Sequence, residues 1–427
     1  MNVASQMQRW RTTIQEVVYG GLPVFTWNAE ELATRFLVTA FFIAPPLFIV
    51  IENAPTAWGI LAPLSVLPLY ALYGGGIKTR WLLVPFAVSA CVALLAALSA
   101  VWSIDAQRSL AGAFVFGAYV LLGFSIVQSL RALSPAHRER VWTALIAGGC
   151  VGLLLLAGYE LTHVAINESG DDITEIARTL HKTTYYGIII ASALLFDAIL
   201  LRNRRRLIFV AVVFAVPTLL FGRSTGINFA ILLIAALYFM NSVWRQRTLV
   251  IFCTCYVAFA FVAPWITPRL FQALSGSKLL DFYSGTFAAR LELWDMVSQH
   301  VGRAWLFGHG ADTMRIATYI VQNPKYYHLP DLPSAHSMVF DLWFELGLIG
   351  ILVLLVIIVE VARRILRLTG AAQLACMSIF LATVIELSVD HRIWLSWMQG
   401  TLIFGVCVCV LAILRQRAHL QQRLPGP

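Results

Sequence analysis

The sequence predicts an all-α integral membrane protein, and three observations support this class. Hydrophobic residues make up 59% of the 427 residues and charged residues only 12%, which leaves too few polar side chains to cover a water-exposed surface. Apolar runs of roughly 20 residues, enough for a helix to cross a hydrocarbon core, recur along most of the chain. The basic residues lie in short clusters between these runs, so the net charge of +9 indicates membrane topology and not binding to nucleic acid.

The apolar runs predict about twelve membrane-spanning helices. Their predicted starts are Phe36, Trp58, Trp81, Leu110, Val141, Thr184, Leu207, Gly226, Thr248, Ser337, Ala371 and Trp394. The first run contains Pro45-Pro46 and the seventh contains Pro217, and neighbouring helices must satisfy the backbone groups that these prolines free. We expect residues 1–427 to form one polytopic membrane domain without internal repeats, with a long polar loop over residues 266–336.

The positions of arginine and lysine predict the orientation, because cytoplasmic loops retain these residues. Basic clusters occur in alternate connections between the predicted helices, at 9–11, 78–80, 131–140, 202–206, 245–247, 363–367 and 415–423. Both termini are then expected in the cytoplasm. The loop 266–336 is expected on the outer side of the membrane, away from ATP and nucleotide sugars.

The long outer loop is expected to contain its own helices. Phe287, Leu291, Trp294 and Val297 recur at helical spacing, so residues 286–300 are expected to form an amphipathic helix near the membrane surface. The glycine-rich sequence 306–310 predicts a turn. A second amphipathic helix is expected over 311–321.

His336 is the first candidate for catalysis, because it lies where the outer loop ends and a membrane helix begins. Ser334 is expected to cap that helix, which would place His336 in its first turn. The positive end of the helix dipole disfavours an imidazolium, so a neutral ring that can act as a general base is expected. The alternative is a boundary histidine that binds a loop carbonyl or a lipid headgroup.

Two arginines are candidates for binding an anion. Arg290 shares the apolar face of the predicted helix 286–300, where its guanidinium would meet either a lipid phosphate or a phosphate of a bound substrate. Arg223 lies in a short outer turn between glycines, where Ser224 and Thr225 add hydroxyl donors. A plain anchor at a helix end is the alternative for Arg223.

Other polar residues are weaker candidates. Asp341 and Glu345 lie one turn apart in the helix after His336, where a carboxylate would orient a partner or bind a coupling proton. Asp390 lies in a short outer turn, from which it would hold His336 or Arg223 unless it is simply an exposed acid. Lys182, at an outer helix end, would bind phosphate or headgroups. The acidic segment 171–175 lacks a complete set of metal ligands, so no metal site is predicted.

These features together resemble the O-antigen ligase and polymerase superfamily of bacterial envelope glycosyltransferases, and within it the ligases. The matching stretches are Leu98–Asp105, Gly222–Gly226, Arg290–Trp294 followed by Leu306–Gly310, and His336–Gly350. Each stretch alone is weakly specific, and the specific signal is their order along residues 90–350.

The resemblance implies a GT-C-like fold in the bacterial inner membrane with an active site that faces the periplasm. It implies an inverting glycosyltransferase without metal or other cofactor, which transfers O-antigen from undecaprenyl pyrophosphate to the lipid A core. In this interpretation Arg223 and Arg290 neutralise the pyrophosphate and His336 is the base. Lys182, Asp390 and Trp102 are expected to contribute to substrate binding, and membrane lipid surrounds the helices.

Three other functions are left open by the sequence. A polymerase and a protein O-oligosaccharyltransferase of the same superfamily would differ from a ligase only in the acceptor. A proton-coupled secondary transporter would also have about twelve helices and intramembrane acids, although no repeated half is visible.

Overall fold

The chain is helical throughout the part that the structure describes. The computed structural model describes the backbone of residues 29–51, 53–73, 80–169, 174–221, 225–277, 286–327, 334–389 and 393–423, and no β-strand occurs in these ranges. Eight helices there are long and apolar enough to cross a membrane, and three further apolar helices are shorter. The protein is therefore a multi-pass membrane protein, while the total of twelve spans stays a prediction.

Most successive helices are joined by short connections. In chain order they are α2 (Ala29–Val50), α3 (Ala54–Tyr73), α4 (Arg80–Ser99), α5 (Ala106–Ala132), α6 (Pro135–Ser169), α7 (Thr174–Leu200), α8 (Arg204–Val210), the π-helical η1 (Ala211–Ala215), α9 (Val216–Phe221), α10 (Thr225–Phe239), α11 (Ser242–Leu274), α13 (Thr286–Val301), the 3₁₀ turns η2 (Gly302–Ala304), η3 (Met314–Ile316) and η4 (Thr318–Ile320), α14 (Met338–Leu366), α15 (Gly370–Val389) and α16 (Ser396–Arg423). Longer connections lie between α11 and α13 and between η4 and α14.

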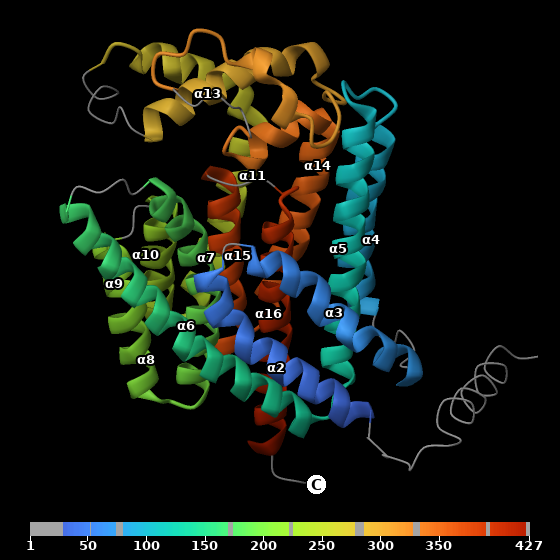
Figure 1. The fold of residues 1–427 in the computed structure, drawn as a ribbon, viewed down its shortest axis with the longest axis vertical. Coiled ribbons are helices and arrows are strands. Elements are labelled where there is room, and N and C mark those ends of the chain that lie inside the picture. Colours follow the sequence, from blue (N-terminus) through green and yellow to red (C-terminus); the bar gives the residue numbers. More distant parts are fainter. Residues whose placement is uncertain are drawn as a thin grey trace, which may run out of the picture.

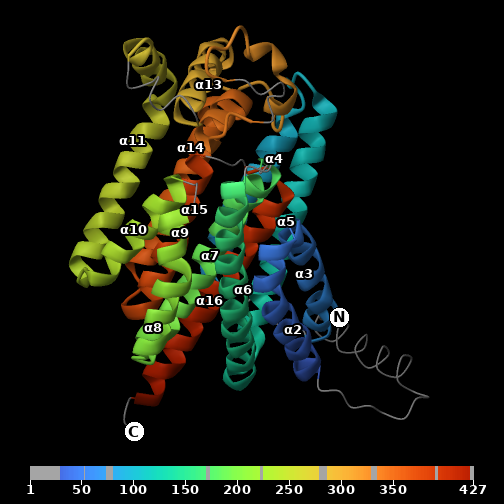
Figure 2. The same ribbon diagram turned by 60° about the vertical axis from the view of Figure 1, so that its left-hand side comes forward.

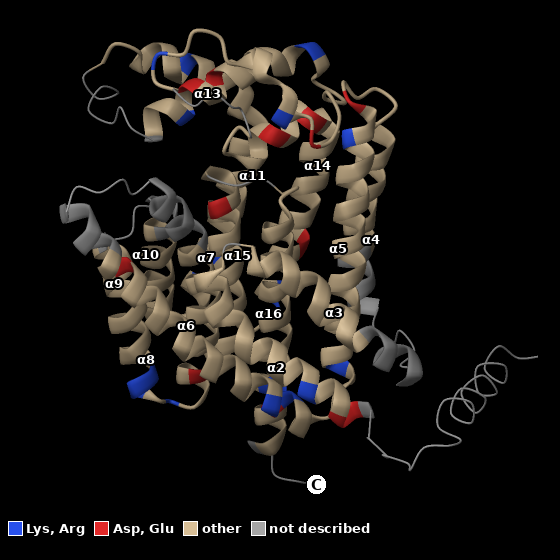
Figure 3. Cartoon of the chain, viewed as in Figure 1, with Lys and Arg blue, Asp and Glu red and all other residues tan. Residues whose placement is uncertain are grey.

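The long helices form a bundle that carries a separate layer at one end (Figures 1 and 2). This layer, here called the cap, comprises residues 286–327 and lies over the first turns of α14. Arginines at the start of α8 and near the end of α16 lie at the opposite end of the bundle (Figure 3). The cap corresponds to most of the polar loop expected from the sequence.

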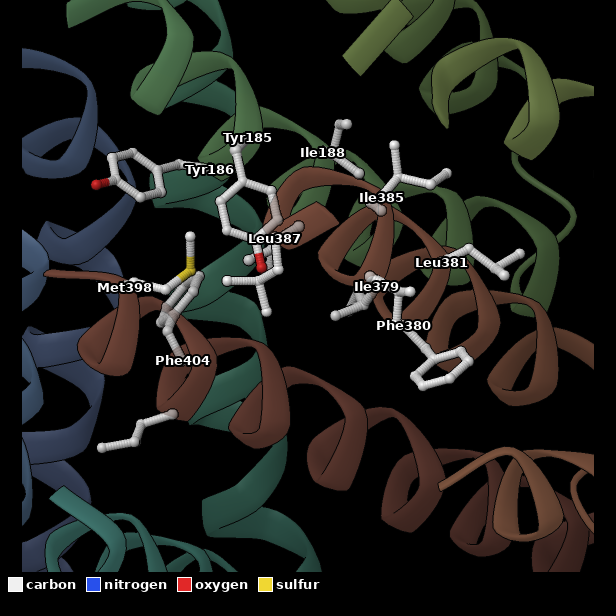
Figure 4. Close-up of a cluster of buried hydrophobic side chains, with 14 of the residues drawn as sticks. Tyr185, Tyr186, Ile188, Ile379, Phe380, Leu381, Ile385, Leu387, Met398 and Phe404 are labelled. Atoms are coloured by element: carbon white, nitrogen blue, oxygen red, sulfur yellow. The ribbon is translucent and has the colours of Figure 1, made fainter. Parts of the chain in front are cut away.

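The centre of the bundle is filled by large side chains of α7, α15 and α16 (Figure 4). Tyr186 and Phe404 are almost fully buried there, and Phe48 of α2 packs on both, with ring centroids 5.4 and 5.1 Å apart. Between α2 and α6 the backbones approach closely, because a Cβ on Gly148 would lie only 2.1 Å from the Phe42 carbonyl oxygen. Packing of this kind replaces the hydrophobic effect as the force between helices in lipid.

The predicted proline interruptions differ from each other in the structure. The helix α2 continues through Pro45 and Pro46 without a break. Before Pro217 the chain adopts the π-helical turn η1. A proline ring displaces the carbonyl four residues earlier and supplies no N–H, which explains a widened turn at this position.

Two expectations for the loop 266–336 need revision, although the predicted helix over 286–300 is confirmed as α13. Helix α11 runs on into this segment and ends at Leu274. The second amphipathic helix, expected over 311–321, is wrong: this stretch contains only the short turns η3 and η4. Its backbone donors are used elsewhere, because Ala311 N–H donates to Ser99 Oγ and Met314 N–H donates to the Glu345 carboxylate.

Candidate active site

Helix α14 is broken at Gly347, and a cap segment is inserted into the break. Gly347 has φ 60° and ψ −153°, far outside the helical region. The Phe344 and Glu345 carbonyls, which would normally accept hydrogen bonds from the next helical turn, instead accept from His309 and Gly310 N–H at 2.8 Å each. In return, the N–H groups of residues 348 and 349 donate to the carbonyls of residues 305 and 306, at 2.8 and 3.3 Å.

We call this four-bond arrangement of residues 305–310 and 344–349 the clasp. It pairs two carbonyls and two N–H groups that the break exposes, as buried backbone polar groups require. Glycine is needed on both sides of the clasp. A Cβ on Gly347 would lie 2.6 Å from the Leu306 carbonyl carbon, and a Cβ on Gly308 would lie 2.3 Å from the Glu345 carbonyl carbon. Both glycines also have positive φ.

Side chains reinforce the clasp. The His309 ring stacks on Phe344, with centroids 4.3 Å apart, and its Nδ1–H donates to the Phe344 carbonyl at 3.0 Å. Burial lowers the pKa of His309 below its usual value of 6.5, so the ring is neutral at neutral pH. The buried Glu345 carboxylate accepts hydrogen bonds from Met314 N–H and from Trp394 Nε1–H. Glu345 therefore holds the cap and the segment before α16 together.

The turn between α4 and α5 completes this region. Ile104 N–H donates to the His309 carbonyl at 3.0 Å, and Trp102 Nε1–H donates to the Phe307 carbonyl at 3.1 Å. Three of the stretches that carry the family resemblance, 98–105, 306–310 and 336–350, therefore meet in space.

His336 has an unusual backbone conformation. Its φ is 50°, in the left-handed region that residues with a Cβ rarely adopt, and its N–H donates to Ser334 Oγ at 3.0 Å. The helix begins at Met338 with Ser337 as the N-cap. The expectation that Ser334 caps the helix and that His336 lies in its first turn is therefore wrong, because the left-handed residue turns the chain before the helix starts.

Side chains from two helices hold the N–H and the carbonyl of Ala335, the residue before His336. Ala335 N–H donates to Asp341 Oδ1 at 2.7 Å, and the Ala335 carbonyl accepts from Trp294 Nε1–H at 2.7 Å. A left-handed residue costs about 1–2 kcal/mol. A hydrogen bond to a charged group contributes about 1.5–3 kcal/mol and a neutral one about 0.5–1.5 kcal/mol, so these two bonds are sufficient to maintain the conformation.

Helix α13 brings Arg290 to the same region. Trp294 stacks on Phe340 of α14, with centroids 5.2 Å apart, and so directs its helix face at the segment that carries His336. Arg290 lies one turn earlier on this face and is half-buried. Four residues advance a helix by about 6 Å, so the Arg290 backbone lies that far along α13 from the contact with Ala335.

The other end of the loop before His336 is also fixed by α13. The buried Glu292 carboxylate accepts from the backbone N–H groups of Lys325, Tyr326 and Tyr327 at 2.7, 2.7 and 2.8 Å. A carboxylate that accepts several backbone N–H groups is well solvated by the protein. Helix α13 thus holds the chain on both sides of residues 328–333.

The predicted site residues are placed as follows. His336 and Arg290 lie on adjoining elements. Trp102 contacts the clasp, and none of the described contacts joins it to Ala335 or Trp294. Arg223 and Asp390 lie outside the described residues, as does the side chain of Lys182. Trp294 was expected only on the apolar face of the helix over 286–300, and the bond between Asp341 and Ala335 was not predicted. The sequence signal for Trp294 was its position one turn after Arg290 on the same face of the predicted helix.

The fold and site define a class of protein: a multi-pass membrane protein in which a cap helix that carries an arginine packs, at one end of the bundle, against the segment that carries a left-handed histidine. The model of the O-antigen ligase family matches residues 210–355, a region that includes α13, the clasp and His336. This match supports assignment of the chain to the O-antigen ligase/polymerase superfamily and confirms the resemblance seen in the sequence. A search of curated proteins finds no match.

Proposed function

We propose that the protein is an O-antigen ligase, which transfers O-antigen polysaccharide from undecaprenyl pyrophosphate to the lipid A core at the periplasmic face of the inner membrane. One observation carries the proposal: Trp294 joins the helix bearing Arg290 to the peptide that precedes His336. A cation for a phosphate and a base for a hydroxyl are the two groups that such a transfer needs. The family match supports this class of reaction.

In this proposal the arginines stabilise the leaving group. The bond between the anomeric carbon and the pyrophosphate oxygen breaks, and the pyrophosphate departs with the electron pair. Arg290 and Arg223 would bind its oxygens through paired N–H donors, which stabilises the charge without a metal ion. Pyrophosphate is already a good leaving group, so no acid has to protonate it.

His336 would act on the acceptor. A neutral imidazole nitrogen takes the proton of the core hydroxyl while the hydroxyl oxygen attacks the anomeric carbon opposite the departing pyrophosphate, so the configuration inverts. Asp341 and Glu345 are assigned structural roles in this proposal, because their carboxylates accept hydrogen bonds from Ala335 N–H and from Met314 N–H and Trp394 Nε1–H, respectively.

The first test is transfer by purified protein in liposomes with lipid-linked O-antigen and lipid A core, with a chelator present. We expect the wild type to shift the acceptor on a gel, and we expect His336→Ala, Arg290→Ala and Arg223→Ala each to lose at least about 100-fold in rate. Arg303→Ala is the matched control, since Arg303 is an exposed cap arginine. It should retain the wild-type rate.

The acceptor arms of this experiment distinguish the members of the superfamily. Elongation of lipid-linked repeat units without transfer to the core would replace the ligase proposal with a polymerase. Transfer to a protein hydroxyl would indicate a protein O-oligosaccharyltransferase. Full activity of His336→Ala would contradict the proposed base.

A further inference from the structure

We propose that Trp294 and Asp341 are positioning residues that set where the His336 imidazole lies relative to Arg290. The inference rests on the proposed function and adds two residues to it. Neither side chain has to contact a substrate for this role. Both act on the peptide groups of Ala335, the residue directly before His336.

The geometry restricts the chain on both sides of His336. Trp294 Nε1–H donates to the Ala335 carbonyl and Asp341 Oδ1 accepts from Ala335 N–H, both at 2.7 Å, so Ala335 can neither rotate nor shift without breaking a bond. After His336, Asp341 N–H donates to the Ser337 carbonyl at 2.9 Å and starts the helix. Asp341 therefore contacts the chain on either side of the left-handed residue, through its side chain and its backbone.

The same contacts couple the histidine to the arginine. Trp294 and Arg290 belong to one rigid helix, and the Trp294 ring lies flat on Phe340, with ring planes 12° apart. A movement of α13 is thereby transmitted to Ala335. A base displaced by about 1 Å can reduce a rate by about 100-fold, so this bond is expected to affect the chemical step more than substrate binding.

The test uses variants that remove one hydrogen bond and preserve shape. Trp294→Phe keeps the stacking on Phe340 and removes the N–H. Asp341→Leu removes the acceptor, whereas Asp341→Asn keeps an oxygen that can accept from Ala335 N–H. The matched control is Trp305→Phe, which alters a cap tryptophan that is 52% exposed and whose described bond to the clasp uses only its backbone carbonyl.

Initial rates of transfer to the lipid A core would be measured in liposomes over a range of donor concentrations, together with the thermal unfolding midpoint of each variant. We expect Trp294→Phe and Asp341→Leu to lower kcat by about 10- to 100-fold with the donor KM within about threefold of wild type. Asp341→Asn should restore kcat to within about fivefold, and Trp305→Phe should match the wild type.

The outcomes separate this inference from the function on which it rests. An inactive wild type would overturn the proposed function. An active wild type with inactive His336→Ala, but with Trp294→Phe at full kcat, would overturn the positioning role alone. A loss in Trp294→Phe that follows a lower unfolding midpoint and affects KM and kcat equally would assign Trp294 to stability only.

Discussion

Arg290 is half-buried and carries a planar fork of donors that lysine cannot reproduce. We expect Arg290→Lys to raise the donor KM or lower kcat/KM by about 10-fold, because a single ammonium cannot bind two phosphate oxygens in parallel. Initial rates at varied donor concentration would measure this. Arg303→Lys is the control, and equal losses in the two variants would contradict a specific role for Arg290.

His309 makes stability depend on pH. Its folded-state pKa lies below 6.5, so at lower pH the unfolded chain binds more protons than the native one. The stability contributed by the neutral ring is complete above pH 6.5 and is lost as the pH falls below that value. We expect the unfolding midpoint of the wild type to drop between pH 7.5 and pH 5, and His309→Phe, which keeps a ring on Phe344, to reduce that drop. An unchanged drop would contradict this assignment.

At the scale of elements, the clasp makes α14 dependent on the cap. Gly347→Ala adds a methyl group 2.6 Å from the Leu306 carbonyl carbon and places a Cβ at φ 60°, which costs at least about 1–3 kcal/mol. We expect a lower unfolding midpoint and weaker activity. Gly302→Ala is the matched control, because nothing lies within 4 Å of its added Cβ. Fluorescence-detected size-exclusion chromatography after heating would measure both variants, and equal midpoints would contradict the dependence.

At the scale of the whole molecule, the proposed orientation places the cap outside the cell membrane. Tyr319 is exposed on the cap and Ser242 is exposed at the other end of α11. In a background without the native cysteines, an impermeant maleimide should label Tyr319→Cys in intact spheroplasts and Ser242→Cys only after permeabilisation. The reverse pattern would invert the topology and exclude a periplasmic site.

The sequence was most informative where hydrophobicity alone decides the structure. It predicted the helical membrane class and the helix over 286–300, because apolar spacing in α13 is a local property. The order of the motifs along the sequence also assigned His336 and Arg290 to one predicted site.

Long-range backbone contacts could not be predicted in this way. The left-handed conformation of His336 depends on Trp294, which is distant in the chain, and the break at Gly347 depends on carbonyls of residues 305 and 306. Local rules therefore placed His336 inside the helix and predicted a helix over 311–321. In both cases, donors or acceptors from other segments form hydrogen bonds with the backbone groups that a helix would use.

The clasp and the bond to Ala335 have a consequence for insertions and deletions. The chain is joined to α14 at Gly310 and at Ala335, and residues 311–327 between these points donate backbone hydrogen bonds to Ser99, Glu345 and Glu292. An insertion or deletion within 311–327 therefore moves backbone donors away from these acceptors, and each buried donor left unpaired costs about 1–3 kcal/mol. We expect changes of length in this part of the cap to be poorly tolerated.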